Sequence, residues 1–302
     1  GYSIERRLGS SGPWDDLGSV SGSTTSFNDP NVGRGKLYEY RVSATNGFGS
    51  ETSAAQSIET LRSTLANIAT RGVLGSGDQS LILGFVIKGT GPIDVLVRAQ
   101  GPELVGKVGD STAAIDPEMT LVETDWTSGS PVNIEIGSND NWGDTQLAEI
   151  KEFFDYGTNP PSFAQPTTED ASLDAGMALN LDSTRVFTVV VTDKGDANGL
   201  ALVEVFDKSR QLEPNDLQNR LVNVATRGFV GTGDDRLIAG FIVDGAVDSK
   251  LLLRGMGPSI GIPGTIVDPK ITLYRTAYEL PGAPQVEVAV NDNWEDAANA
   301  AE

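Results

Sequence analysis

Hydrophobic and polar residues alternate in the first part of the chain as they do in β-strands. The alternation is short over Tyr2–Arg6 and longest over Leu37–Thr45, where Tyr38, Tyr40 and Val42 share one face. Successive side chains of a strand point to opposite faces, so this pattern predicts a sheet with one apolar face.

Shorter segments extend this first region. One strand is expected to begin at Trp14, a second to cover Thr24–Phe27, and a last one to cover Glu51–Glu59. The dipeptide Asn46-Gly47 is a strong signal for a tight turn between antiparallel strands. The region is therefore expected to fold as one antiparallel β-unit.

The remaining sequence contains one pattern that occurs twice. LANIATRG at Leu65–Gly72 returns as LVNVATRG at Leu221–Gly228, 156 residues later. The same separation relates GSGD at 75–78 to GTGD at 231–234, LILGFVIKG at 81–89 to LIAGFIVDG at 237–245, and VLVRAQGP at 95–102 to LLLRGMGP at 251–258. Farther on, Asp-Pro at 116 and 268 and NDNW at 139 and 291 are 152 residues apart. Tandem copies of one module are typical of arrays that hold, span or display other molecules.

Apolar and β-branched runs predict the strands of the first copy. They are expected at Leu65–Arg71, Leu81–Ile87, Val95–Ala99, Met119–Glu123, Val132–Ile136, Ala171–Leu181, Arg185–Thr192 and Leu200–Asp207. Apolar residues at 147, 150, 153 and 154 follow helical spacing, which predicts a short helix over Thr145–Phe154 with Asp144 as its N-cap.

These elements predict an all-β fold of tandem antiparallel β-sandwiches. An immunoglobulin-like first unit is expected, then two related β-sandwich repeats with a short decorating helix. The expected domains are a partial one at 1–61, a complete repeat at 65–212 and an incomplete repeat at 221–302, joined by short linkers at Arg62–Thr64 and Gln211–Arg220. The second copy is called incomplete because no counterparts of Arg185–Thr192 and Leu200–Asp207 follow it.

Composition excludes several kinds of chemistry. The chain has no Cys and no His, and its 42 acidic and 22 basic residues give a net charge of −20. It therefore has no disulfides, thiol nucleophiles or Ser-His-Asp triad, and it lacks the commonest zinc ligand. The negative charge disfavours nucleic acid and anionic membranes as partners and favours divalent cations. No run of about 18 apolar residues predicts a membrane span.

The best candidate for a binding site is the NDNW motif with the acid that follows it. Its oxygen-bearing residues are Asn139, Asp140, Asn141 and Asp144 in the first copy and Asn291, Asp292, Asn293 and Asp296 in the second. Calcium takes six to eight oxygen ligands, so these residues are candidate calcium ligands, although the spacing is not that of an EF-hand. Alternatively, the Asx side chains cap a turn, with Trp142 and Trp294 packed beneath it.

Other repeated motifs favour structural roles. Gly75–Asp78 and Gly231–Asp234 lack the Lys-Ser/Thr of a phosphate loop and are expected to be turns. Arginines recur at positions 71, 98, 227 and 254, and we expect them to pair internally with Asp78, Asp116 or the copies of these acids rather than to bind a carboxylate ligand. No catalytic residue is expected.

The first region resembles a fibronectin type III domain. The resemblance is carried by YSIER, Trp14, TSFNDP and above all YEYRVSATNGFGSETS, in which Tyr38 takes the tyrosine-corner position of that family. It covers only the later strands of the family, whose first two strands would precede Gly1. It implies half of an immunoglobulin-like sandwich.

The repeats resemble modules of large bacterial surface and secreted proteins. The shared pattern is TRGxxGxGD, RAxGP, DPxLxL, NDNW and ALVEV. It is carried here by Thr70-Arg71-Gly72, Gly77-Asp78, Arg98-Ala99, Gly101-Pro102, Asp116-Pro117, Asn139–Trp142 and Ala201–Val205. The resemblance spans Leu65–Glu302. It implies an extracellular or cell-surface location beside immunoglobulin-like domains.

Together these observations predict a non-catalytic structural or adhesive array, a segment of a bacterial surface stalk or fibre. Its expected partners are copies of itself or neighbouring repeats, which either continue the same chain or donate strands to its open edges. The alternative is a set of accessory modules of a larger secreted enzyme that bind surface glycan or cell wall.

Overall fold

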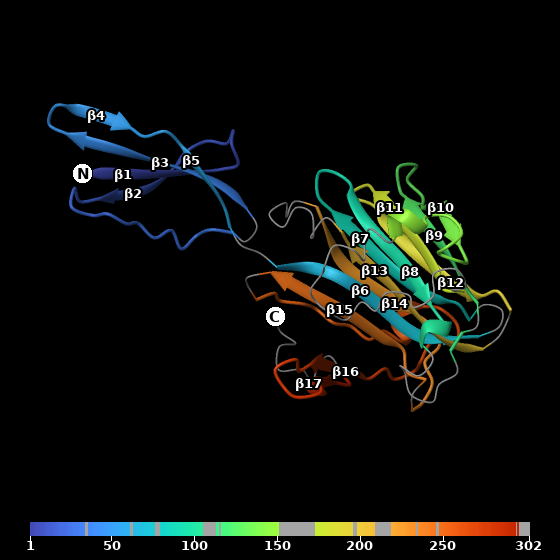
Figure 1. Ribbon diagram of the computed structural model, residues 1–302. Coiled ribbons are helices and arrows are strands. Elements are labelled where there is room, and N and C mark those ends of the chain that lie inside the picture. The colour runs from blue at the N-terminus through green and yellow to red at the C-terminus, as the bar shows by residue number, and fades with distance from the viewer. Residues whose placement is uncertain are drawn as a thin grey trace. The chain divides into compact units, whose positions relative to one another are not determined.

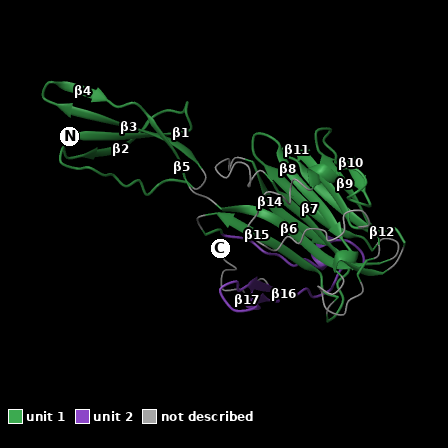
Figure 2. Ribbon diagram, in the orientation of Figure 1, with its two compact units in different colours: residues 1–249 green, residues 250–302 purple. Residues whose placement is uncertain are grey.

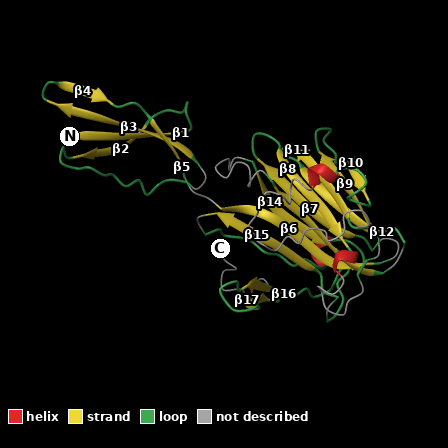
Figure 3. Cartoon of the chain, viewed as in Figure 1, coloured by secondary structure: helices red, strands yellow, loops and turns green. Residues whose placement is uncertain are grey.

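The computed structural model describes residues 1–33, 36–60, 63–75, 79–104, 113–114, 116–150, 173–195, 198–208, 219–233, 235–245, 248–293 and 295. Among these residues strands dominate and the helices are short (Figure 3), which confirms the predicted all-β class. Two compact units, residues 1–249 and 250–302, are coloured separately in Figure 2.

The first region is a five-stranded antiparallel sheet in the order β2-β1-β3-β4, with β5 also beside β3 (Figure 1). Its strands are β1 (Tyr2–Leu8), β2 (Asp15–Val20), β3 (Leu37–Asn46), β4 (Gly49–Thr52) and β5 (Gln56–Glu59). The long alternating segment thus becomes the central strand.

The tight turn at Asn46 forms as the sequence predicts, and Tyr38 bonds the backbone. The hydroxyl of Tyr38 accepts a hydrogen bond of 2.9 Å from the N–H of Gly33, the kind of backbone contact that a tyrosine corner makes. The side chain of Asn46 accepts one of 2.8 Å from the N–H of Phe48 in the tight turn between β3 and β4.

Two expectations for this region are wrong. Thr24–Phe27 is not a strand, because the hydroxyl of Ser21 bonds the hydroxyls of Ser23 and Thr24 and the N–H of Thr24 donates to the carbonyl of Ser21. Such local bonds compete with strand pairing. The expected last strand, Glu51–Glu59, is interrupted at residues 53–55 and forms β4 and β5.

The first repeat supplies eight strands, all close to their predicted positions. They are β6 (Ser63–Leu74), β7 (Leu81–Lys88), β8 (Ile93–Gln100), β9 (Pro117–Asp125), β10 (Val132–Asn139), β11 (Ala175–Leu181), β12 (Val186–Asp193) and β13 (Gly199–Asp207). Because β6 begins at Ser63, two of the three residues expected as a linker belong to a strand. The residues at 211–218, in the other expected linker, lie outside the described residues.

These strands form a two-layered sheet with a single core. The order is β10-β9-β12-β7-β14-β6-β13-β8-β11, with β15 also beside β6. Since β14 and β6 meet at only one residue pair, the sheet divides there into two layers. Phe85, Leu121 and Val189 from one layer pack with Ile68 and Val203 from the other. This sandwich is the architecture that the sequence predicts.

The second copy contributes strands to both layers of this sandwich. Its strand β14 (Arg220–Arg227) pairs with β7, and β15 (Ile238–Gly245) pairs with β6. Sequence-adjacent copies therefore share sheets.

The unit of residues 250–302 contains one hairpin, β16 (Ile271–Thr276) with β17 (Gln285–Asn291). It repeats the hairpin of β9 and β10, including a register shift at Val288 that corresponds to Ile136. A one-turn 3-10 helix covers Pro258–Ile260, as another covers Pro102–Leu104 in the first copy.

Candidate functional site

The first NDNW motif forms a turn that is tied to β11 by Asn139. The side-chain oxygen of Asn139 accepts a hydrogen bond of 2.8 Å from the N–H of Gly176. Its amide nitrogen donates to the carbonyl of Asn141 at 3.1 Å and to the hydroxyl of Thr145 at 3.3 Å. The side chain is buried, so this amide serves to fix the turn.

The other polar residues of the motif do not share a partner. Asp140 forms an ion pair with Lys194, whose hydrogen bond holds the pKa of Asp140 below its usual range. The side-chain oxygen of Asn141 is buried and meets no hydrogen-bond donor among the described residues. The N–H of Asp144 donates to the carbonyl of Asn141 at 3.1 Å.

Trp142 is packed beneath the turn, as the structural alternative predicts. Its side chain lies in a small cluster with Leu96, Ile150 and Phe206, and its backbone N–H donates to the carbonyl of Asp174 at 2.9 Å. Residues 147–150 are helical, which confirms part of the predicted helix, and the residues beyond 150 lie outside the described part. The helix begins after Gln146, so Asp144 is not its N-cap.

The second copy repeats one hydrogen bond of this turn, the one between Asn139 and the carbonyl of Asn141. The side-chain nitrogen of Asn291 donates to the carbonyl of Asn293 at 3.0 Å, Asp292 is exposed, and Asp296 lies outside the described residues. Among the described residues, no three acidic side chains gather as a metal site would require. The geometry favours the capped turn, and calcium binding by these residues stays a prediction.

A small cavity of about 20 Å³ lies beside Trp142 and Asp174 and has room for about one water molecule. Burial is the main cause that raises the pKa of Asp174 to about 6, although its carboxylate accepts a hydrogen bond of 2.8 Å from the N–H of Gly101. This volume is too small for an organic ligand.

Arg98 forms a buried ion pair with Glu204 rather than with Asp116, which corrects the predicted partner. The guanidinium Nε lies 2.7 Å from Glu204 Oε2, and the guanidinium carbon lies 5.1 Å from the ring centre of Phe206. Glu204 sits directly opposite Arg98 on the neighbouring strand. The sequence prediction did not include Glu204. An acidic residue inside the apolar run of β13 indicates a buried charge that needs a partner.

The two copies of the repeat meet across an approximate twofold axis. Leu65 and Leu221, which are equivalent in the repeat, lie directly opposite each other where β6 touches β14. The hydroxyls of Thr70 and Thr226, also equivalent, share a hydrogen bond. Residues meet their own counterparts in this way in an isologous contact, so each copy presents the same surface to the other. We call this contact the repeat joint.

Strand pairing follows the same symmetry. Ala225 lies opposite Gly84 where β14 pairs with β7, and Ala69 lies opposite Gly240 where β15 pairs with β6. Each pairing has one register shift, at equivalent positions of β14 and β6. The joint is therefore built twice from the same residues.

Glycines of the TRG motif allow this close approach. A Cβ at Gly72 would lie 2.9 Å from Leu81 and 3.0 Å from Leu237, and a Cβ at Gly228 would lie 3.0 Å and 3.1 Å from the same two leucines. Any larger residue at either glycine would displace the ends of two leucine side chains, one from each copy. The TRG motif can be recognised in the sequence, but this role depends on leucines that are distant in sequence.

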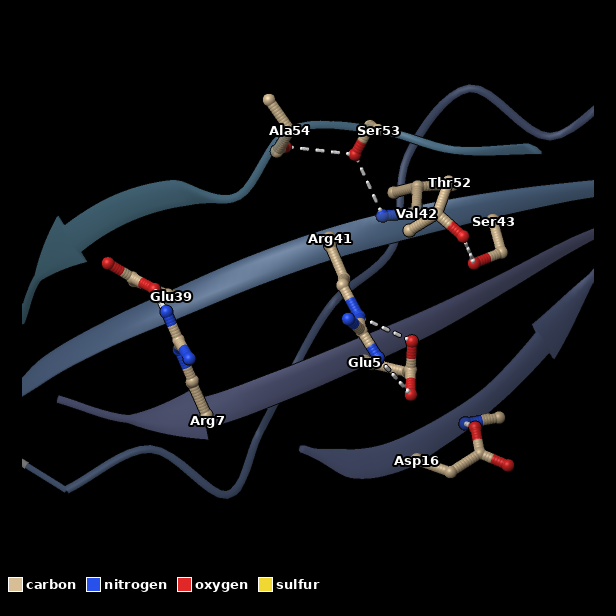
Figure 4. Close-up of polar contacts among 11 residues, drawn as sticks. Glu5, Arg7, Asp16, Glu39, Arg41, Val42, Ser43, Thr52, Ser53 and Ala54 are labelled. Carbon is tan, nitrogen blue, oxygen red and sulfur yellow. Dashed lines mark hydrogen bonds and ion pairs between the residues drawn. The ribbon is translucent and has the colours of Figure 1, made fainter. Parts of the chain in front are cut away.

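Polar side chains cover one face of the first sheet, as Figure 4 shows. Arg41 donates to the carboxylate of Glu5 at 2.7 Å and 3.0 Å, and Arg7 donates to Glu39 at 2.7 Å. The hydrogen bond from Arg41 lowers the pKa of Glu5. Both guanidinium groups also contact the ring of Trp14, at 4.2 Å for Arg41 and 4.6 Å for Arg7. The charges on this face therefore pair with one another.

No protein-family model, no curated protein and no solved structure matches this chain. Among the described residues, no helix has the length and apolar character to cross a membrane.

Proposed function

We propose that this chain is a non-catalytic structural segment of an extracellular, cell-surface stalk or fibre. The repeat joint is the observation that carries the proposal. Consecutive copies are connected by shared hydrogen-bonded sheets, since β14 extends one layer of the first sandwich and β15 the other. Its partners are neighbouring repeats of the same kind.

Shared sheets resist bending and extension better than a flexible linker does. The β15–β6 pairing joins eight residue pairs and the β14–β7 pairing joins seven, and the strand pairs would have to separate before the copies could move apart. Proteins that transmit force or hold a shape benefit from such a connection. An acidic surface without thiols suits a soluble filament outside the cell.

Single-molecule pulling on the full chain tests the mechanical part of the proposal. If β14 and β15 belong to the sandwich, residues 63–245 should unfold in one event that releases roughly 60 nm of chain. Gly72→Ala should lower the unfolding force because its methyl group meets two leucines, whereas Gly240→Ala has room for its methyl group at 3.6 Å. Separate, low-force release of β14 and β15 would contradict the proposal.

Location is tested independently on intact cells of the source organism. Antibodies raised against the chain should label unpermeabilised cells, and external protease should remove the label. Label that appears only after permeabilisation would rule out a surface stalk.

Glycan binding is a second candidate function, favoured by exposed aromatic side chains. Trp126 in the turn after β9 is 61 % exposed, and Tyr278 in the other unit is 66 % exposed. Aromatic rings of this kind can stack on sugar rings. Retention of the chain on an insoluble polysaccharide, lost in Trp126→Ala, would favour this function over the stalk.

A further inference from the structure

Strand β14 has one paired edge and one open edge. The paired edge joins β7 over Arg220–Arg227. On the other edge, backbone pairing with β6 is confined to Leu221 opposite Leu65, and none of the strands that the structure describes pairs with residues 223–227 on this side.

The equivalent edge in the first copy is fully paired, and its partner is known. β6 pairs with β15 on one edge. On the other edge it meets β14 at Leu65 and then pairs with β13, with residues 67–74 opposite residues 199–206. Because β6 and β14 are equivalent and are related by the repeat joint, the partner of one edge identifies the partner that fits the other.

Side chains of β14 are more exposed than those of β6, as expected for a strand with a neighbour on only one edge. Ile68 in β6 is 0 % exposed, whereas its equivalent Val224 in β14 is only partly buried against the core. Every second residue of β14 from Asn223 to Arg227 is exposed, while most of β6 is buried. A strand beside β14 would remove apolar surface from water, which favours binding.

We infer that the open edge of β14 binds a strand of the β13 type from a repeat of the same kind. Main-chain hydrogen bonds supply affinity, and alternating apolar side chains supply specificity, as in other cases of β-strand addition. The register of β13 on β6 fixes the expected register on β14. Glu204 lies opposite Ala69 in the first copy, so the corresponding position of the bound strand lies opposite Ala225.

This inference rests on the proposed array function and adds the identity of the element that extends the array. It differs from the repeat joint, which is already formed within the chain. Failure of strand binding would leave the pulling result on the joint unchanged, so the two can be distinguished.

The first test uses a synthetic peptide with the sequence of residues 199–207, GLALVEVFD, added to the full 302-residue chain. Binding at one peptide per chain is expected. At about 100 times its Kd, the peptide should raise the unfolding midpoint by about 5 °C. A peptide with Val203→Pro should bind at least about 10-fold more weakly, because proline interrupts strand pairing. No binding, or equal binding of both peptides, would overturn the inference.

The second test measures register. The chain has no cysteine, so Ala225→Cys introduces a single thiol. A peptide with Glu204→Cys should form a disulfide with it, whereas Val203→Cys should not, because neighbouring residues of a strand point to opposite faces. Equal cross-linking of the two peptides would show that binding does not follow the register of β13 and would overturn the assignment.

Discussion

One segment of the repeat adopts different structures in its two copies. In the first copy it is β8, which lies between β13 and β11 and buries Val95 and Val97 completely. In the second copy the corresponding residues, LLLRGM at 251–256, form no strand, and Leu252 is 83 % exposed. The apolar pattern is the same, so neighbouring strands rather than local preference decide whether this segment becomes a strand.

The equivalent strands β7 and β15 likewise differ in how deeply they are buried. Phe85 in β7 is 1 % exposed and stacks on Phe187 with ring centres 5.3 Å apart. Its equivalent Phe241 in β15 is only partly buried. Both strands pair with a strand of the other copy, but of the two only β7 has a second neighbour among the described strands.

The two copies should differ most in the stability that they lose when these phenylalanines are replaced. Phe85→Ala should reduce the free energy of unfolding by about 3–5 kcal/mol, because it leaves a cavity in a closed core. Phe241→Ala should cost about 1 kcal/mol, since its site is partly open to solvent. Urea unfolding of the full chain measures both. Equal losses would mean that β15 is as well enclosed as β7.

Arg98 and Arg254 provide the next comparison. Arg98→Met removes the partner of buried Glu204 and should destabilise the chain by about 3 kcal/mol. Arg254→Met, at the equivalent exposed position, should change stability by less than about 0.5 kcal/mol. The double variant Arg98→Met/Glu204→Leu should recover most of the loss. If it does not, the ion pair itself stabilises the sandwich.

Asp174 makes the first copy sensitive to pH. Its folded-state pKa of about 6 exceeds the usual 3.8, so the folded state binds the proton more tightly than the unfolded state does. Stability should therefore fall as pH rises from about 4 to about 6, by about 2–3 kcal/mol, and then stay constant. Asp174→Asn should remove this slope, and exposed Asp182→Asn should not. A slope that persists in Asp174→Asn would assign it to another group.

Substitution of Asp140 and of Asp292 should show the smallest difference in lost stability between the copies. Asp140→Asn breaks an ion pair with half-exposed Lys194 and should cost about 0.2–1 kcal/mol, whereas exposed Asp292→Asn should cost almost nothing. The lowered pKa of Asp140 means that its contribution is lost as pH falls below about 4.

Thermal unfolding with millimolar CaCl₂ tests the calcium hypothesis for the same motif. A calcium-dependent rise in midpoint that Asp140→Asn abolishes would support it.

Strand positions were predictable because alternation and β-branched content are local properties. The runs at Arg185–Thr192 and Leu200–Asp207 gave β12 and β13 almost to the residue. The expected strand at Thr24–Phe27 is wrong because hydroxyl side chains bond locally there. Residues 251–256 copy the apolar pattern of β8 but form no strand, and no described strand pairs with them. Neither outcome can be seen in a short window of sequence.

Partners across strands were harder to predict than the strands themselves. β14 pairs with β7 of the other copy, yet its alternation fits a strand of either copy equally well. The candidate site shows the same limit. The spacing of NDNW identified a polar turn, but the role of Asn139 depends on Gly176, which is distant in sequence.

The near-twofold symmetry of the repeat joint has a consequence for how such a gene can grow. An ordinary head-to-tail contact needs two different surfaces, each of which must be adapted to the other. Here both sides carry the same residues, as the contact of Thr70 with Thr226 illustrates. Duplication of the coding segment therefore supplies both halves of a working contact at once, and an array can lengthen in a single genetic step without a new interface having to evolve.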